Sequence, residues 1–385
     1  ITLDADTFMP KDSAFHLIGT ISHVLNRAKI KDKKVVRGYG IMQPKVSISI
    51  ESKNYTPFAK IFAGDGGIDG YSIAYSDTYQ DLFGEGSFVG KGIIDIDVFR
   101  EVIDGLIKEN TILSHDLLEG ALVRSALVTD VEFIDNYPST YESSSIRLHR
   151  WVRGDWQLLK WLFSSRLSLL SRWKIFDNLR RSLLAPSLML ILLLNITTLN
   201  GEKQIAVMCF LAAVIPLLFN ITDFVVTPKN KIIGTFKSLK QTMIILSFIP
   251  YQSYMMIDAI IRTLFRMFIS KKHLLQWKTA EEAEKETNNS SFAYVKRMWF
   301  SIAVGIGIIF ISILNASMLV TIINAFIGAL WIVSPYIAYS LSIPYEEDKF
   351  ELSHGEKTFL RDNTRRIWAY YEDFVNDENN YLAPD

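Results

Sequence analysis

Three long stretches without charged residues, all after residue 182, constrain the fold of this chain most. The longest covers residues 298–345, which is 48 positions without Asp, Glu, Lys or Arg, and the others cover 183–199 and 204–222. A helix that crosses a bilayer needs about 20 predominantly apolar residues. We therefore predict four transmembrane helices: a hairpin from the two shorter stretches, and two spans within the longest, joined by a turn near 315–324.

A fourth apolar stretch, 241–257, is ambiguous. It contains Pro250 and runs into Asp258, Arg262 and Arg266, which are four residues apart and so share one face of a helix. An apolar helix with such a charged face lies in the membrane interface instead of crossing the bilayer. We favour an interfacial helix near 241–277, and a fifth span is the alternative.

Composition divides the chain into a mixed region typical of a soluble domain, 1–182, a membrane region, 183–345, and a charged, aromatic tail, 346–385. Lysine-rich loops at 227–240 and 270–297 flank the predicted spans, so the positive-inside rule places them, and with four spans both ends of the chain, in the cytoplasm. The chain starts at Ile1 without a signal peptide, and we read it as an internal fragment of a longer protein.

The charge balance argues against a nucleic-acid partner. Lys and Arg equal Asp and Glu, 41 against 41, so the sequence predicts no strongly basic surface. The single cysteine, Cys209, excludes a disulfide within the chain and lies in an apolar stretch, where it is expected to pack as a small buried residue.

Two carboxylates follow the first apolar residues of the chain. We expect residues 1–3 to form a buried strand end that delivers Asp4 and Asp6 to one loop. At this spacing both carboxylates can face a divalent cation, the kind of ion that neutralises a nucleotide diphosphate. The alternative is a solvated acidic turn, because an Asp-x-Asp pattern is common by chance.

A glycine-rich stretch, 84–92, has four glycines in nine residues and could bring backbone close to a sugar or phosphate. It lacks the spacing of a Walker loop, and we expect Lys91 within it to lie on the surface.

Residues 114–120 resemble the start of a helix, with Ser114 as N-cap and Asp116 in the first turn. Asp116 could act as a general base on a sugar hydroxyl, or simply complement the helix dipole. His115 and Glu119, four residues apart, have no third ligand at a metal-binding spacing.

Directly before the first predicted span, Arg147, Arg150 and Trp151 combine donors for phosphate oxygens with a flat face for a sugar ring. The alternative is an aromatic and basic anchor at the membrane interface.

An Asp-x-Asp pair, an acidic helix start and an Arg-x-x-Arg-Trp motif before membrane helices, in this order, resemble the membrane-bound, processive family-2-like glycosyltransferases. Longer motifs are similar to those of the cyclic β-1,2-glucan synthases, namely 79–88, 114–120, 149–157, 273–277 and 365–385. The resemblance implies an α/β glycosyltransferase fold, GT-A-like and truncated at its N-terminus, followed by the helical membrane region. It also implies that 346–385 begins a linker toward a downstream carbohydrate-active domain.

The resemblance further implies an inverting glucosyltransferase of the bacterial inner membrane. It would transfer glucose from UDP-glucose to the 2-hydroxyl of a β-1,2-glucan acceptor, with the catalytic domain in the cytoplasm. Asp116 would be the base, and Asp6 and Asp4 would hold Mg²⁺ or Mn²⁺ against the diphosphate, Asp6 more directly. Arg147, Arg150 and Trp151 would bind the donor diphosphate and the acceptor end.

In the family that the chain resembles, a further aspartate upstream of the Asp-x-Asp pair contacts the uridine. We expect this chain to start after that aspartate. The fragment can therefore be inactive even where its parent enzyme is active.

The alternatives are another processive synthase, making a cellulose-, chitin- or hyaluronan-like polymer, or a membrane protein that binds glucan or nucleotide sugar without turnover. The cellulose-, chitin- and hyaluronan-like synthases usually carry Gln where this chain has Arg147. The predicted spans carry no ionisable residues at mid-membrane, so we expect a separate exporter for the product.

Overall fold

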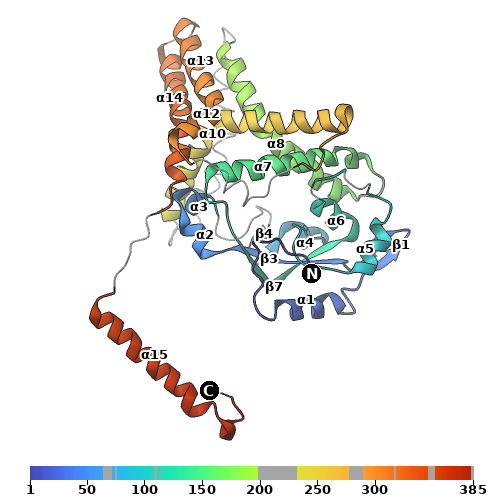
Figure 1. Cartoon of the computed structure of the whole chain (residues 1–385). Coiled ribbons are helices and arrows are strands. Elements are labelled where there is room, and N and C mark those ends of the chain that lie inside the picture. The colour runs from blue at the N-terminus through green and yellow to red at the C-terminus, as the bar shows by residue number, and fades with distance from the viewer. Residues whose placement is uncertain are drawn as a thin grey trace. The chain divides into compact units, whose positions relative to one another are not determined.

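The structure is a computed structural model that describes residues 1–63, 72–73, 76–107, 111–113, 115–197, 232–276, 289–315, 318–345 and 352–382. It divides into two compact units, Ile1–Pro344 and Tyr345–Asp385. The described part of the first unit is mostly helical and contains small sheets (Figure 1).

A three-stranded sheet organises the N-terminal half of the first unit. The central strand β3 (Ile41–Ile48) pairs parallel with β7 (Ser125–Asp135) and antiparallel with the short β6 (Ile93–Ile94). The register between β3 and β7 shifts after Pro44, which has no N–H to donate to the ladder. The strand β2 (Lys34–Arg37) precedes β3 in the chain. Two smaller pairs complete the strands: β1 (Lys29–Lys31) with β2, and β4 (Ser72–Ile73) with β5 (Ser76–Asp77).

Helices cover both faces of this sheet because side chains of successive strand residues point to opposite faces. On one face, Met42 packs with Leu17 of α1 (Ser13–Ser22) in a core that also holds Phe133. On the other face, Ile41 belongs to the core built with α5 (Ile96–Ile103) and α6 (Asp116–Val123). Figure 1 shows α1 below the sheet and α6 above it. Three short helices lie along the connections: α2 (Ile50–Tyr55), α3 (Pro57–Phe62) and α4 (Thr78–Phe83).

Above α6 lies the long helix α7 (Tyr141–Gln157), followed by a 3₁₀ turn, η1 (Leu158–Phe163), and by α8 (Leu169–Thr197). A capping box between Thr140 and Ser143 satisfies the first N–H groups of α7. The indole of Trp156 donates to Ser182 Oγ at 2.9 Å, which joins α7 to α8. Because α8 runs through position 182 without a break, the boundary predicted there lies within one helix and remains a prediction.

Apolar helices of membrane length follow. Among the described residues, two helical segments are long and apolar enough to cross a membrane, Lys240–Ser270 and Thr321–Leu341. A third exists if α12 (Ser291–Arg297) and α13 (Trp299–Asn315), bent by 66°, are one span. α14 (Met318–Leu341) starts inside the predicted turn at 315–324. The predicted span at 204–222 lies outside the described residues.

Glycines bring α13 and α14 together. A Cβ atom on Gly305 would lie 2.6 Å from the carbonyl oxygen of Gly328, so the two backbones are in contact there. Farther along, Asn324 donates a hydrogen bond to Ser312 Oγ at 2.8 Å. Small residues at the crossing and a polar bond between helices are typical of packing inside a bilayer.

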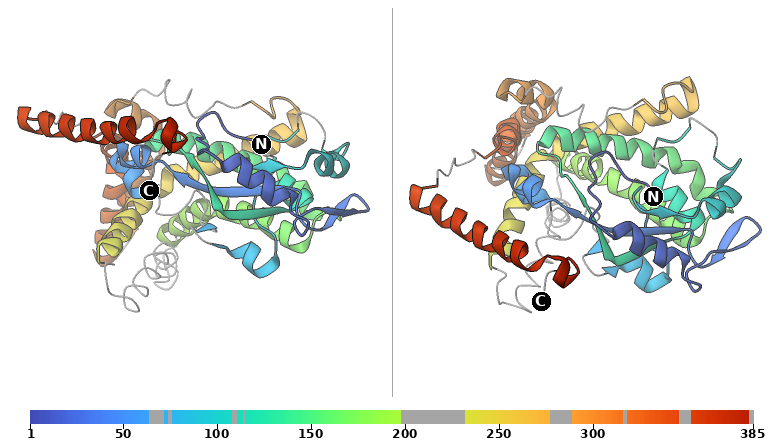
Figure 2. Two further views of the ribbon diagram at one scale, coloured as in Figure 1. Left: turned by 90° about the horizontal axis from the view of Figure 1, so that it is seen from below. Right: turned by 60° about the horizontal axis from the view of Figure 1, so that its bottom comes forward.

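The helix α10 (Ile232–Phe265), extended by a π-helical turn, η2 (Arg266–Ser270), has two different long faces. One face packs on Val152 of α7 through the buried side chains of Met255, Met256, Ala259 and Ile260. The other face is exposed and apolar, and its side chains are those of Tyr254, Ile257, Ile261, Phe265 and Phe268. Figures 1 and 2 show the C-terminal half of α10 beside α7, directed across α13 and α14.

The second unit consists of α15 (His354–Phe374) and a 3₁₀ turn, η3 (Asp377–Asn379). A capping box formed by Ser353 and Glu356 starts α15, and Trp368 is among its exposed aromatic residues.

Candidate active site

The first residues of the chain are held against the ends of two strands. Thr2 and Gly92 exchange backbone hydrogen bonds of 2.8 and 3.1 Å, and Phe8 and Ile134 exchange bonds of 2.7 and 2.9 Å. Between these bridges, the loop with Asp4 and Asp6 is fixed at both ends. The predicted buried strand end is wrong, because the side chains of Ile1 and Leu3 are exposed and only an isolated bridge forms.

Lys91 is buried beneath this loop, so its predicted surface position is also wrong. Its Nζ lies 2.9 Å from Asp4 Oδ2 and forms a second ion pair with Asp135, the last residue of β7. Thr7 Oγ1 donates to the other oxygen of Asp135 at 2.6 Å. Burial alone lowers the pKa of Lys91, but the two carboxylates outweigh it and raise the pKa, so the ammonium stays charged.

Asp116 opens α6, and the backbone of the glycine-rich stretch passes directly over its carboxylate. Gly90 has φ of 89°, and a Cβ atom there would lie 3.2 Å from both carboxylate oxygens of Asp116. His115 occupies the N-cap position without a capping side-chain bond, and the predicted cap Ser114 lies outside the described residues. The close backbone approach expected of the glycines is therefore made to the carboxylate of Asp116.

Glu119, on the next turn of α6, is a second carboxyl group near Asp116. Burial, with a smaller contribution from the negative charge of Asp116, raises the pKa of Glu119 to about 7. Perturbed carboxyl groups of this kind concentrate at functional sites. Its i, i+3 spacing from Asp116 was the available sequence signal, because residues at this spacing share a helix face.

The basic face of α7 carries charges opposite to those of the acidic residues. Burial lowers the pKa of Arg150, while the carboxylates of Asp4, Asp116 and Asp6 act on it in the opposite direction. Arg147 is subject to the same balance, with Tyr137, Asp135 and Asp6 raising its pKa against the effect of burial. The predicted acidic and basic site residues therefore act electrostatically on one another, although more than 100 positions separate Asp6 from Arg147.

Trp151 completes this face of α7. The guanidinium carbon of Arg147 lies 4.5 Å from the centroid of the Trp151 ring, a cation–π contact between residues one turn apart. The tryptophan remains 40% exposed, so part of its ring is open to a ligand.

The opposite face of α7 is bound to α10 and to the segment after it. His149 Nε2 lies 3.0 Å from Asp258 Oδ2, and Arg153 donates to the carbonyl oxygen of Gln276 at 2.8 Å. These contacts set the rotation of α7 about its axis. Arg147, Arg150 and Trp151, at three- and four-residue spacing, share a different face of α7.

The donor set at the Asp4–Asp6 loop fits a divalent cation that shares its ligands with a substrate. Asp6 is exposed, and Asp4 uses one oxygen for Lys91. Mg²⁺ is commonly held by one or two carboxylates together with water and substrate phosphates. Among the described residues no group of three or more His, Cys, Asp or Glu side chains could hold a metal ion, so the remaining ligands would come from substrate and water.

No protein-family model matches the chain. It is 36% identical, over 403 aligned positions that cover the whole chain, to the cyclic β-(1,2)-glucan synthase NdvB of Rhizobium meliloti (strain 1021). The chain spans 14% of the length of that relative. The resemblance to cyclic β-1,2-glucan synthases inferred from the motifs is thereby confirmed.

Proposed function

Because the whole chain is similar to a segment of a cyclic β-(1,2)-glucan synthase, we propose that it is the glucosyl-transfer and membrane part of such an enzyme. It transfers glucose from UDP-glucose to the 2-hydroxyl of a growing β-1,2-glucan. The observation that carries the proposal is that the carboxylates of Asp4, Asp6 and Asp116, which come from two distant parts of the chain, all favour the charged form of Arg150. The fold we propose for the sheet and its helices is GT-A-like.

Asp116 is the proposed general base. It lies half-buried at the start of a helix, with the backbone of Gly90 packed against its carboxylate. It accepts the proton of the acceptor 2-hydroxyl as that oxygen bonds to the anomeric carbon of the donor glucose. The bond from this carbon to the diphosphate oxygen breaks in the same displacement, which converts an α-linked donor into a β-linked product.

The donor diphosphate is proposed to lie between the Asp4–Asp6 loop and α7. Arg147 and Arg150 donate to phosphate oxygens, and Asp6 and Asp4 hold Mg²⁺ or Mn²⁺. The cation supplies neutralisation of the leaving diphosphate. Lys91 holds Asp4 in place through its ion pair, and the open face of Trp151 stacks on a sugar ring at the acceptor end.

The membrane assignment follows from the apolar helices. We propose that α13 and α14 cross the bacterial inner membrane, that α10 lies in the interface, and that the catalytic face is cytoplasmic. The exposed apolar side chains of α10 suit contact with lipid. A separate exporter carries the product. The alternatives are another processive synthase and a binding protein without turnover. The following experiment distinguishes both from a β-1,2-glucan synthase.

The test replaces Asp116 by Asn in the full-length parent protein and follows β-1,2-glucan formation from UDP-glucose. We expect kcat to fall by about 10²- to 10⁴-fold, because a positioned base contributes that much, with UDP-glucose binding retained. The matched control is Asp130→Asn, an exposed aspartate on β7, which should leave the rate unchanged. Wild-type product with β-1,4 or β-1,3 linkages would overturn the acceptor assignment. Unchanged synthesis by the Asp116 variant would remove this residue from the mechanism.

A further inference from the structure

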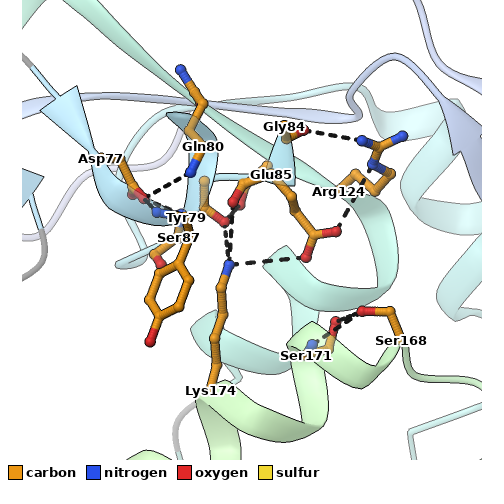
Figure 3. Close-up of polar contacts among 12 residues, drawn as sticks. Asp77, Tyr79, Gln80, Gly84, Glu85, Ser87, Arg124, Ser168, Ser171 and Lys174 are labelled. Carbon is orange, nitrogen blue, oxygen red and sulfur yellow. Dashed lines mark hydrogen bonds and ion pairs between the residues drawn. The ribbon is translucent and has the colours of Figure 1, made fainter. Parts of the chain in front are cut away.

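A buried cluster of charges lies at the beginning of the glycine-rich stretch, outside the groups that the proposed reaction uses. The carboxylate of Glu85 has Lys174 Nζ 3.9 Å from one oxygen and Arg124 Nε 4.0 Å from the other (Figure 3). The side chains of Glu85 and Lys174 are 10% and 5% exposed. A buried charge cluster is costly to desolvate, so its presence calls for an explanation.

The short contacts of this cluster go to the backbone. Lys174 Nζ donates to the carbonyl oxygen of Gly86 at 2.7 Å and to that of Glu85 at 3.4 Å, and Arg124 donates to the carbonyl of Gly84 at 3.0 Å. Two cations thus hold three successive carbonyl groups. The buried Oε1 atom of Glu85 has no hydrogen-bond partner in the described part of the chain, so this carboxylate acts on Lys174 through its charge.

The same segment reaches the candidate active site a few residues later. Gly90 lies against the carboxylate of Asp116, and Lys91 bridges Asp4 and Asp135. Between the two ends, the backbone is held by the bond from Val89 N to Gln43 Oε1 at 3.0 Å. Only a short stretch of chain separates the carbonyl of Gly86 from Gly90, so a displacement of the carbonyls of 84–86 would reach backbone that lies against Asp116.

The cluster also joins two other elements to this segment. Lys174 belongs to α8, the helix that leads into the first predicted span, and its Nζ lies 4.8 Å from the centroid of the Tyr79 ring. Arg124 follows α6, the helix that Asp116 opens, and has a φ of 58°, unusual for a residue with a side chain. The cluster thus fixes the glycine-rich segment relative to both helices.

We propose that Glu85 and Lys174 are positioning residues that hold segment 84–92 over the candidate active site. They keep Gly90 against Asp116 and Lys91 between its two carboxylates, and Lys174 sets this position relative to α8. The inference rests on the proposed function for its kinetic consequence, whereas its structural consequence, an ordered 84–92 segment, is independent of catalysis.

The experiment compares Glu85→Gln, Lys174→Gln and the double variant in the full-length parent protein. Each single change removes one charge of the Glu85–Lys174 ion pair and leaves the other charge buried, whereas the double change replaces both by neutral amides. We expect each single variant to lower kcat on the order of 10-fold and to raise KM for UDP-glucose, because a small misplacement at the site is costly. The double variant should recover most of both losses.

Hydrogen exchange of the peptide covering 84–92 is the second measurement. We expect faster exchange in the single variants and near wild-type exchange in the double variant. Glu132→Gln, which removes an exposed carboxylate paired with Lys45 on the same sheet, is the matched control and should change neither measurement.

Single variants with lower thermal stability, but with wild-type kcat, KM and exchange, would overturn the positioning role and leave only a stabilising one. A wild-type parent that makes no glucan would contradict the proposed function instead. In that case the exchange measurement still decides the inference.

Discussion

Lys91 and Glu119 show at the residue scale how burial acts differently on two charges beside the same site. Lys91 has two carboxylate partners, which outweigh desolvation and keep it ionised. Glu119 has Asp116, of like charge, as its neighbour, so desolvation and repulsion act together and raise its pKa to about 7. The charge beside the proposed base therefore changes around neutral pH.

Glu119→Gln tests this difference through stability. The pKa of Glu119 is about 7 in the folded state against an ordinary value of 4.5, so the folded state binds the proton more tightly. Folded stability is consequently lost as the pH rises through this window. Between pH 5 and pH 8, we expect the free energy of unfolding of the variant to rise by about 1 kcal/mol relative to that of wild type. This value is smaller than the full pKa shift implies, because Glu119 is partly exposed to solvent.

Thermal unfolding of the solubilised parent protein at the two pH values measures this gain. Glu101→Gln, an exposed carboxylate on α5, is the control. An equal pH dependence of Tm in the Glu119 variant and wild type would contradict the raised pKa.

At the scale of single elements, α7 places two functions on two faces. Arg147, Arg150 and Trp151 follow a three- and four-residue spacing and face the acidic loop, whereas His149 and Arg153 bind α10 and the segment after it. The spacing within the helix was visible in the sequence. Which face meets the acidic residues depends on the contacts of α7 with α10.

Two glycines of α13 offer a prediction, because one lies against the backbone of α14 and the other does not. Gly305→Leu forces a side chain into the backbone of α14, where even a Cβ atom would lie 2.6 Å from the Gly328 carbonyl oxygen. We expect a loss of about 1–3 kcal/mol of stability, the usual cost of overpacking. Gly307→Leu, on the same helix with nothing within 4 Å of its Cβ position, should be tolerated. Thermal unfolding in detergent measures both, and equal losses would contradict the contact.

At the scale of the whole first unit, the membrane helices and the sheet region share α10. By length and composition the segment Lys240–Ser270 could cross a membrane. Its C-terminal half nevertheless packs along α7 and is directed across α13 and α14 (Figure 2). A bilayer that contains α13 and α14 would therefore meet the exposed apolar face of α10 from the side.

Spin-label depth measurements test this geometry in reconstituted parent protein whose native cysteines, Cys209 among them, have been replaced. A label at Ile261→Cys, on the exposed face of α10, should lie about 5–10 Å into the headgroup and acyl boundary. A label at Phe326→Cys, exposed in the middle of α14, should lie near the bilayer centre. Equal depths at the two positions would favour a fifth span over an interfacial helix.

The sequence by itself determined the features that depend on neighbours along the chain. Charge-free length predicted the apolar α14, whose segment Thr321–Leu341 is long and apolar enough to cross a membrane. Spacing predicted the shared face of Arg147, Arg150 and Trp151, and motif order predicted the resemblance to glucan synthases that the comparison confirms.

Only the tertiary structure decided which distant residues meet. Lys91 pairs with Asp4 and Asp135 because the first residues of the chain bridge to the ends of β6 and β7, and Glu85 meets Lys174 because α8 packs beside α6. Local hydropathy could not separate an interfacial α10 from a spanning one, since the difference lies in what its faces contact. Periodicity is a property of neighbouring residues, whereas burial and ion pairing depend on elements that come together only in the folded chain.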